Sequence, residues 1–433
     1  MTFTLDRRFL LAGLGGALAA PELAFAHASA DHWPALKALE DGYIDAKRLP
    51  GMVIAVKSGK DAPVFFSKGV QGLEDPTPVS PATLFRVYSM TKPITGMAVM
   101  KLIEDGKLSL DQPVSDVVPE LGKVQVLKNP ADPAAGLEPL ARPILIRHLL
   151  THTAGLGYSI IPGAIGKLYT RYGIVPGGRA TEKEAGADYA PVQTLDEMAQ
   201  RLAMVPLGAQ PGTRWSYSVG LDVLGLVIQR VSKMPFDVYL QKTFFTPLRM
   251  NDTFFTVPAA KASRLAAVQA MKDGKLATTE PGQAASPFAK PTGLNSGGGG
   301  LVSTAADYIR FTSMLLNEGT LDGRRVLKPE TVRLAMSNLM PAGVAFRGFG
   351  PGGAPNGYGA GGSVILPGGE APGRDPATTY SWFGIAGTQM WVDPVNKLSV
   401  VCMIQMYPNS TPIQGELRAA AYKDLAAMKS SAA

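Results

Sequence analysis

Short apolar runs of strand length lie near both ends of this chain, and longer helical patterns lie between them. Residues 51–70 hold two apolar runs around a polar Ser-Gly-Lys-Asp turn, the pattern of a β-hairpin. Three further strands are predicted at "GGSVILPGG", "TQMWVD" and "LSVVCMIQMY", and residues 393–397 are predicted to join the last two. Strands at both ends predict one sheet that contains a helical insertion.

Helical periodicity begins at residues 93–104, which are apolar on nearly every side and predict a helix in the middle of a core. Further helices are predicted at "IRHLLTHTAGL", "LDEMAQRLAMV", "GLDVLGLVIQRVS", "STAADYIRFTSMLLNEG" and "PIQGELRAAAYKDLAAMK". Ser303 or Thr304 could cap the fourth of these. Residues 156–189 are glycine-rich and poorly periodic, so we expect a long loop or flap there.

These elements predict an α/β fold in which an antiparallel sheet is flanked by helices and carries an inserted, mainly helical domain. The predicted sheet domain comprises residues 31–115 and 306–433. The predicted insert comprises residues 116–305, with the flap at 156–189. We find no internal repeat.

Residues 1–26 have the features of an export signal. Two arginines at positions 7 and 8 precede an apolar stretch over residues 9–20, and Ala-Phe-Ala at 24–26 fits a cleavage site. The arginine pair resembles a twin-arginine signal, and a Sec signal or an uncleaved anchor is the alternative. We expect cleavage and a periplasmic or secreted protein. No later segment has eighteen apolar residues without charge, so no membrane span is expected after cleavage.

Composition narrows the function classes. The 433 residues are 46% hydrophobic, which is enough for one large core or two moderate ones. The formal net charge is +7, but without a run of Lys and Arg, so nucleic-acid binding is not expected. The single cysteine, Cys402, can form neither an intrachain disulfide nor a zinc site, and its apolar surroundings predict burial. With only four histidines, we expect no metal and no cofactor.

The segment "YSMTKPITGMAVMKLIEDGK" contains the only Ser-x-x-Lys of the chain, Ser89 with Lys92. Residues three apart share a helix face, about 5–6 Å between Cβ atoms. Backbone N–H groups converge at a helix N-terminus and would stabilise a serine oxyanion there, and the lysine could accept the serine proton. The alternative is that Ser89 only caps the helix and that Lys92 lies on the surface.

Two further segments could complete a nucleophilic site. Tyr217, in "QPGTRWSYSVGLDVLG", precedes a predicted helix and could relay a proton to the leaving group. In "SWFGIAGTQMW", Gly384 and Gly387 would let a substrate approach a strand edge, so that a backbone N–H could join that of Ser89 in an oxyanion hole. The alternative for Tyr217 is an ordinary half-buried tyrosine. The alternative for the second segment is a core strand with glycines at bulges.

Taken in order, Ser89-x-x-Lys92, Tyr217 in "PGTRWSYS", then "GGGGLVSTAADYIRF" and "WFGIAGT" resemble the β-lactamase-like serine hydrolases. That superfamily includes class C β-lactamases, D,D-peptidases and family VIII carboxylesterases. The resemblance covers residues 36–425 and implies the superfamily's sheet fold. It also implies that Ser89 is the acylated nucleophile, Lys92 its proton partner and Tyr217 the proton shuttle.

The same resemblance implies that the backbone N–H groups of Ser89 and Ile385, the residue after Gly384, form the oxyanion hole. The motif needs no histidine as a base. His152 is therefore interpreted as a structural residue near the site.

Two positions depart from the β-lactamase pattern. Val219 stands where the usual Tyr-x-Asn has its asparagine, and Trp382-Phe383-Gly384 stands where Lys-Thr-Gly is usual. The asparagine amide and the lysine charge, which are missing here, are the groups best suited to bind a β-lactam. Each charge-assisted hydrogen bond to such a substrate would be worth about 1.5–3 kcal/mol. Trp382 and Phe383 would instead form an aromatic wall suited to an uncharged ester, as in the family VIII carboxylesterases.

We therefore expect an exported serine carboxylesterase that hydrolyses short-chain, uncharged, small-molecule esters through an acyl-enzyme. The alternatives are a β-lactamase or D,D-peptidase acting on β-lactams or D-alanyl peptides, and an acyltransferase. A non-catalytic, penicillin-binding-like protein would need a broken nucleophile set, whereas Ser89, Lys92 and Tyr217 are all present.

Overall fold

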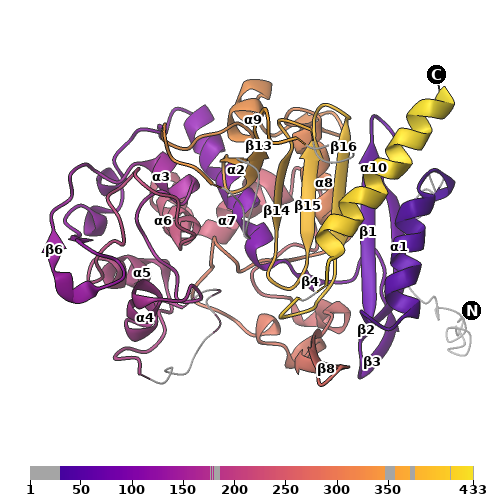
Figure 1. The fold of residues 1–433 in the computed structure, drawn as a ribbon, viewed down its shortest axis with the longest axis horizontal. Coiled ribbons are helices and arrows are strands. Elements are labelled where there is room, and N and C mark those ends of the chain that lie inside the picture. Colours follow the sequence, from indigo (N-terminus) through magenta and orange to yellow (C-terminus); the bar gives the residue numbers. More distant parts are fainter. Residues whose placement is uncertain are drawn as a thin grey trace, which may run out of the picture.

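The computed structural model (Figure 1) describes residues 30–432 except 176, 178, 180–185, 347–355, 371–375 and 410. The predicted export signal lies outside the described residues. None of the described helices is both long enough and apolar enough to cross a bilayer. The helices are α1 Pro34–Asp45, α2 Thr91–Glu104, α3 Ile146–Leu150, α4 Ala164–Arg171, α5 Leu195–Leu202, α6 Gly220–Ser232, α7 Phe236–Leu240, α8 Ala305–Leu316, α9 Pro329–Ala335 and α10 Ile413–Ala432.

The strands fall into one large sheet and several short pairs. They are β1 Gly51–Ser58, β2 Val64–Gly72, β3 Asp75–Pro78, β4 Phe85–Arg86, β5 Val126–Leu127, β6 Leu137–Glu138, β7 Val268–Lys272, β8 Lys275–Glu280, β9 Val302–Ser303, β10 Thr320–Leu321, β11 Arg324–Arg325, β12 Asn356–Tyr358, β13 Ser363–Ile365, β14 Tyr380–Phe383, β15 Gln389–Asp393 and β16 Leu398–Met403.

Both ends of the chain contribute to one antiparallel sheet, which confirms the predicted fold class. In the described residues the strand order is β12-β13-β14-β15-β16-β1-β2-β3. The N-terminal hairpin joins the C-terminal strands where β1 pairs with β16, with Ile54 opposite Cys402. The predicted hairpin between the last two strands is also present, with Asp393 opposite Leu398.

Helices cover both faces of this sheet, which explains its almost uninterrupted apolar strands. Alternate residues of a strand point to opposite faces. Met52, Ile54 and Val56 of β1 belong to the core shared with α1 and α10, whereas Val53 and Ala55 belong to the core shared with α2 and α8. Figure 1 shows α1 and α10 side by side on one face of the sheet, and these two helices are in contact.

Helix α2 occupies the centre of the larger core. Eleven of its 14 residues are buried, as its all-round apolar sequence predicted. It begins at Thr91, two residues before the predicted start, and a 3₁₀ turn over Tyr88–Met90 leads into it. The first turn of α2 therefore starts inside the protein, where side chains can be held away from bulk water.

The helical part of the chain lies beside the sheet, on the left in Figure 1, and contains α3 to α6. Residues 156–189, predicted as a flap, include the eight-residue helix α4, which was too short to give a clear period. The β7–β8 hairpin is bonded to the sheet domain, because Gln269 N donates to Gln405 O at 3.0 Å. The predicted boundary at residue 305 assigns this hairpin to the insert, and the domain boundaries themselves stay a prediction.

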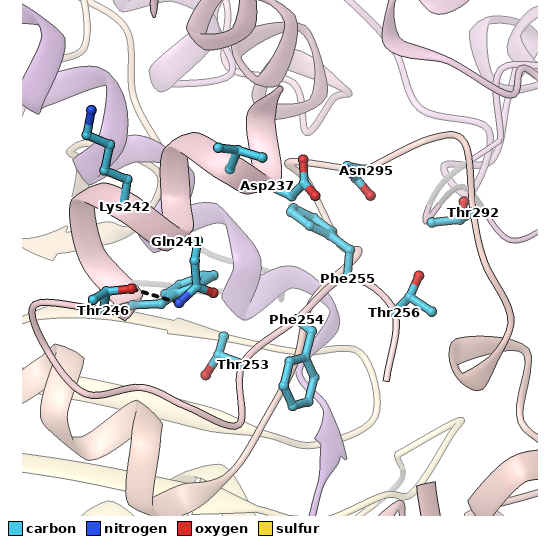
Figure 2. Close-up of a pocket in the computed structure, with 12 residues that line it drawn as sticks. Asp237, Gln241, Lys242, Thr246, Thr253, Phe254, Phe255, Thr256, Thr292 and Asn295 are labelled. Atoms are coloured by element: carbon cyan, nitrogen blue, oxygen red, sulfur yellow. Dashed lines mark hydrogen bonds between the residues drawn. The ribbon is translucent and has the colours of Figure 1, made fainter. Parts of the chain in front are cut away.

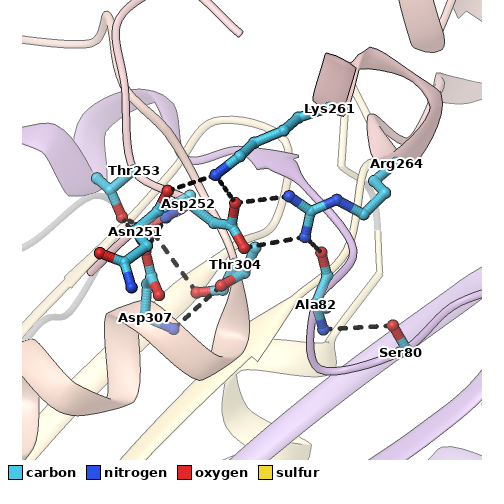
Figure 3. Close-up of polar contacts among 10 residues, drawn as sticks. Ser80, Ala82, Asn251, Asp252, Thr253, Lys261, Arg264, Thr304 and Asp307 are labelled. Atoms are coloured by element: carbon cyan, nitrogen blue, oxygen red, sulfur yellow. Dashed lines mark hydrogen bonds and ion pairs between the residues drawn. The ribbon is translucent and has the colours of Figure 1, made fainter. Parts of the chain in front are cut away.

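A polar network ties the start of α8 to neighbouring loops (Figure 3). Arg264 donates to Asp252 Oδ2 at 2.9 Å and to the Ala82 carbonyl at 2.9 Å. Asp252 N in turn donates to the Asp307 carboxylate at 2.7 Å, and burial raises the pKa of Asp307 to about 6. Thr304, one of the two predicted caps, accepts from Asp307 N at 3.0 Å.

Candidate active site

Ser89 lies in the 3₁₀ turn between β4 and α2. Tyr88, the residue before it, has a φ of 43°, so the chain bends sharply just before the serine. The N-cap of α2 is Met90, and the interpretation of Ser89 as the capping residue is therefore wrong. Ser89 is partly exposed and lines a cavity, which leaves its hydroxyl open to a ligand.

Lys92 is fully buried, which excludes its interpretation as a surface lysine. Its Nζ donates to Ser89 Oγ at 3.2 Å and to the Gly298 carbonyl at 2.5 Å. The same nitrogen lies 4.6 Å from the centre of the Tyr217 ring and 5.5 Å from that of Tyr158. Two oxygens and two aromatic faces thus surround the amine in place of water.

Tyr217 lies in the loop before α6 and is 8% exposed. Its Oη donates to Ser89 Oγ at 2.7 Å. Lys92 and Tyr217 therefore both point a donor at the same serine oxygen, although the tyrosine lies 128 positions from the serine. Two converging donors stabilise negative charge on that oxygen as it loses its proton. The structure brings the three predicted residues together, and their catalytic roles stay a prediction.

A buried carboxylate that the sequence analysis missed, Asp222 of α6, supports this arrangement. It accepts from Gly298 N at 3.0 Å and from the Ser296 hydroxyl, and the Gly298 carbonyl in turn accepts from Lys92. Burial raises the pKa of Asp222, and the charge of Lys92 opposes that shift. The only sequence signal was an acidic residue in the first turn of a helix, which is ordinary.

The Ser89 hydroxyl faces a cavity of about 280 Å³ with mainly apolar walls. Three large apolar side chains among its lining residues are strongly exposed, Ile160 at 43%, Ile385 at 37% and Tyr407 at 45%. Exposed side chains of this size next to a reactive group offer a surface to an apolar ligand. The lining residues are Tyr88, Ser89, Tyr158, Ile160, Gly177, Arg179, Glu280, Phe288, Gly299, Ile385 and Tyr407.

Ile385 lies in the tight turn between β14 and β15, which Gly384 N closes by donating to Thr388 O at 2.7 Å. A Cβ atom at position 384 would lie 2.6 Å from the Val87 carbonyl, so only glycine allows the turn to come this close. Thr388 Oγ1 donates to the same carbonyl at 3.3 Å. The turn therefore brings Ile385 to the cavity of Ser89, and its backbone N–H as the second oxyanion donor stays a prediction.

The aromatic wall predicted from Trp382 and Phe383 does not belong to this cavity. Trp382 is 3% exposed, its ring lies 5.9 Å from that of Tyr217, and with Phe383 it lines a separate cavity of about 200 Å³. Val219 is 1% exposed in the core. Trp382 and Phe383 lie within β14, whereas the turn beyond the strand reaches Ser89. The aromatic wall of the Ser89 cavity is made instead by Tyr88, Tyr158, Phe288 and Tyr407.

Among the residues that the structure describes, two charged side chains line the Ser89 cavity, and both have partners. Glu280 is ion-paired with the fully buried Arg86, with Nε 2.5 Å from the carboxylate oxygen. Arg179 donates to the carbonyls of Lys290 at 2.9 Å and Pro287 at 3.3 Å. Groups that already have partners give a charged substrate little to gain, because it would have to break these bonds.

A larger cavity of about 660 Å³ lies elsewhere, between α7 and residues 253–256 (Figure 2). None of the predicted site residues lines it. In the part of the chain that the structure describes, no three His, Cys, Asp or Glu side chains are grouped as metal ligands. Cys402 is buried, as predicted, and burial raises the pKa of its thiol.

The sheet flanked by helices, with a serine and a lysine one turn apart at the start of a buried helix, defines a class of serine hydrolase. The chain belongs to the Beta-lactamase family, whose model matches residues 36–423. It is accordingly an enzyme of the serine hydrolase type with the β-lactamase-like fold.

Known relatives extend over most of the chain. Protein Rv1367c of Mycobacterium tuberculosis is 36% identical over 374 residues, which cover 84% of this chain and 88% of that protein. Esterase EstB of Burkholderia gladioli is 33% identical over 383 residues, 85% and 89% of the two chains. The solved structure of EstCE1, a hydrolase with promiscuous acyltransferase activity, matches with a TM-score of 0.74 and 26% identity over 90% of this chain and 98% of its own.

Proposed function

We propose that this protein is a serine esterase that hydrolyses short-chain, uncharged carboxylic esters through an acyl-enzyme on Ser89. One observation carries the proposal: Lys92 Nζ and Tyr217 Oη converge on Ser89 Oγ at 3.2 and 2.7 Å beside a mainly apolar cavity. The similarity to Esterase EstB supports an ester as the substrate class.

In the proposed reaction, Ser89 Oγ attacks the ester carbonyl while its proton passes to the amine of Lys92. The backbone N–H groups of Ser89 and Ile385 hold the resulting oxyanion. The bond to the alcohol then breaks, Tyr217 gives its proton to the departing oxygen, and Lys92 returns a proton to the tyrosine. Water attacks the acyl-enzyme by the same route, which releases the acid and restores the serine hydroxyl.

The cavity walls favour an uncharged ester. Ile160, Ile385 and Tyr407 present apolar surface at the cavity, and each buried CH₂ of a ligand gains about 0.8 kcal/mol. Glu280 and Arg179 are engaged by protein groups. A volume of about 280 Å³ suits a small acyl or alcohol group better than a long chain.

The test is a panel of p-nitrophenyl acetate, butyrate and octanoate together with nitrocefin. We expect a p-nitrophenol burst equal to the enzyme concentration and the best turnover on acetate or butyrate. Ser89→Ala should lower the rate at least about 10³-fold, whereas Ser67→Ala, on an exposed position of β2, should leave it unchanged. Full activity in Ser89→Ala would overturn the mechanism. Faster turnover of nitrocefin than of every ester would favour the β-lactamase alternative.

Acyl transfer is a second candidate, because an alcohol can attack the same acyl-enzyme in place of water. The similarity to EstCE1, which is described as a hydrolase with promiscuous acyltransferase activity, supports acyl transfer as a candidate function. The products formed from p-nitrophenyl butyrate in the presence of added butanol distinguish acyl transfer from hydrolysis. Butyl butyrate as the main product would indicate a transferase, and butyrate as the main product an esterase.

We also propose export of the protein through its paired arginines at positions 7 and 8. Fractionation of bacteria that produce the full chain should find the esterase activity in the periplasm. Replacing both arginines by lysine should leave the activity in the cytoplasm. Unchanged export of that variant would contradict the twin-arginine route and point to a Sec signal.

A further inference from the structure

His152, in the loop after α3, combines complete burial with a strained backbone. It is 0% exposed and has a φ of 56°. Residues other than glycine rarely adopt this conformation, and where they do the surroundings must hold them in it. The proposed mechanism assigns nothing to this histidine, yet its contacts centre on Tyr217.

His152 holds the peptide groups on both sides of Tyr217. Ser216 N donates to the His152 carbonyl at 2.8 Å, and Ser218 N donates to His152 Nδ1 at 3.2 Å. The imidazole also lies against the phenol ring, with 4.7 Å between the ring centroids. One residue therefore holds the tyrosine at three points, before it, after it and on its ring.

These contacts also define the protonation state of the ring. Because a backbone N–H donates to Nδ1, that nitrogen carries no proton, and the Ser218 hydroxyl lies 3.0 Å from the same nitrogen. The proton is then on Nε2, which has no hydrogen-bond acceptor among the described residues. Burial and the charge of Lys92 both lower the pKa of His152, so the ring stays neutral.

We infer that His152 is a positioning residue for Tyr217, a neutral clamp that keeps the tyrosine hydroxyl 2.7 Å from Ser89 Oγ. The inference rests on the proposed function only in that the Tyr217 hydroxyl must stay hydrogen-bonded to Ser89 Oγ while the tyrosine relays a proton to the leaving group. A misplacement of about 1 Å in such a group costs about 10²-fold in rate. Removing the clamp should therefore slow the chemical step and leave substrate binding nearly unchanged.

Three substitutions at position 152 distinguish the hydrogen bond that Nδ1 accepts from the effects of side-chain size and of buried area. In His152→Asn the side-chain oxygen takes the place of Nδ1, and asparagine tolerates the positive φ. In His152→Gln the oxygen lies one bond too far to accept from Ser218 N, and in His152→Ala it is missing. We expect kcat to fall at least about 30-fold in the Ala and Gln variants, and less than about fivefold in the Asn variant, with KM within about threefold in all three.

A double-mutant cycle with Tyr217→Phe tests whether the effect passes through the tyrosine. The measured quantity is the rate at which a fluorophosphonate labels Ser89, which needs no ester substrate. We expect His152→Ala to slow labelling at least about 30-fold in the wild-type background and at most about threefold in Tyr217→Phe.

Equal effects in both backgrounds would overturn the inference, as would an Asn variant that is folded by thermal melting but as slow as the Gln variant. If the Ala variant does not fold, the same cycle is run with the Gln variant. A wild-type protein that is labelled but hydrolyses no ester would refute the proposed function, and the labelling cycle would still decide the role of His152.

Discussion

Replacing Tyr217 with phenylalanine removes one oxygen atom and keeps the ring, so it isolates the proposed proton relay. The hydroxyl lies 2.7 Å from Ser89 Oγ, and the residue is only 8% exposed, so water has little room to replace it. A single general acid–base group contributes about 10²–10⁴-fold, which corresponds to about 2.7–5.4 kcal/mol at 1.36 kcal/mol per factor of ten. We expect kcat/KM for p-nitrophenyl butyrate to fall by that factor.

The stability of this variant should change little, because the ring keeps its neighbours His152 and Trp382, at 4.7 and 5.9 Å between centroids. One lost hydrogen bond costs about 1 kcal/mol, which is a shift of about 1–2 °C in the Tm of a chain this long. Tyr380→Phe is the matched control, since its buried hydroxyl donates to the Ala360 carbonyl, also at 2.7 Å.

The assay compares the burst amplitude, kcat/KM and Tm of the two variants with those of the wild type. The control should keep its rate within about threefold. Tyr217 is not the proton relay if Tyr217→Phe retains more than a third of the wild-type kcat/KM, or if both variants lose the same factor.

Three further predictions concern the surroundings of the site and the core. In Gly384→Ala the new Cβ would lie 2.6 Å from the Val87 carbonyl, so we expect the turn to move away and kcat/KM to fall about 10²-fold; fluorophosphonate labelling at the wild-type rate would contradict this. Asp222→Ala leaves the Gly298 N–H without its acceptor, so kcat/KM should fall at least about tenfold, whereas Ser296→Ala should lower it less than about threefold. Burial raises the pKa of Glu40 from 4.5 to about 7, so the folded state binds this proton more tightly than the unfolded state does. The free energy of unfolding of the wild type should therefore fall as the pH rises between those values, by about 3 kcal/mol at most. Glu40→Gln should abolish this part of the fall in Tm between pH 5 and 8, and an identical Tm profile for both proteins would show that Glu40 is not responsible.

The elements were predictable where one local pattern was long and unambiguous. The all-round apolar run of α2 and the strands of β1 and β16 are buried as their sequences indicated. The helix α4 was missed because eight residues in a glycine-rich segment give too few turns for a period to stand out. The order along the chain of Ser89-x-x-Lys92, Tyr217 in "PGTRWSYS", "GGGGLVSTAADYIRF" and "WFGIAGT" was enough to identify the family, because that order follows the fold.

The lining of the cavity was not predictable in the same way. Trp382 and Phe383 stand at the expected place in the sequence, yet the turn beyond β14 brings Ile385 to the Ser89 cavity instead. Which side of a strand end faces a site depends on how the strand pairs and on the path of the next turn, and neither leaves a local signature.

The sequence by itself determined the fold class, the family and the three residues proposed for the chemistry, because each depends on residue types at short spacing or in a set order. Only the tertiary structure decided that Asp222 supports the lysine through Gly298 and that His152 holds Tyr217 on both sides. These contacts join residues 66 to 206 positions apart. Their formation depends on the packing of whole helices and loops, which no local pattern of apolar and polar residues specifies.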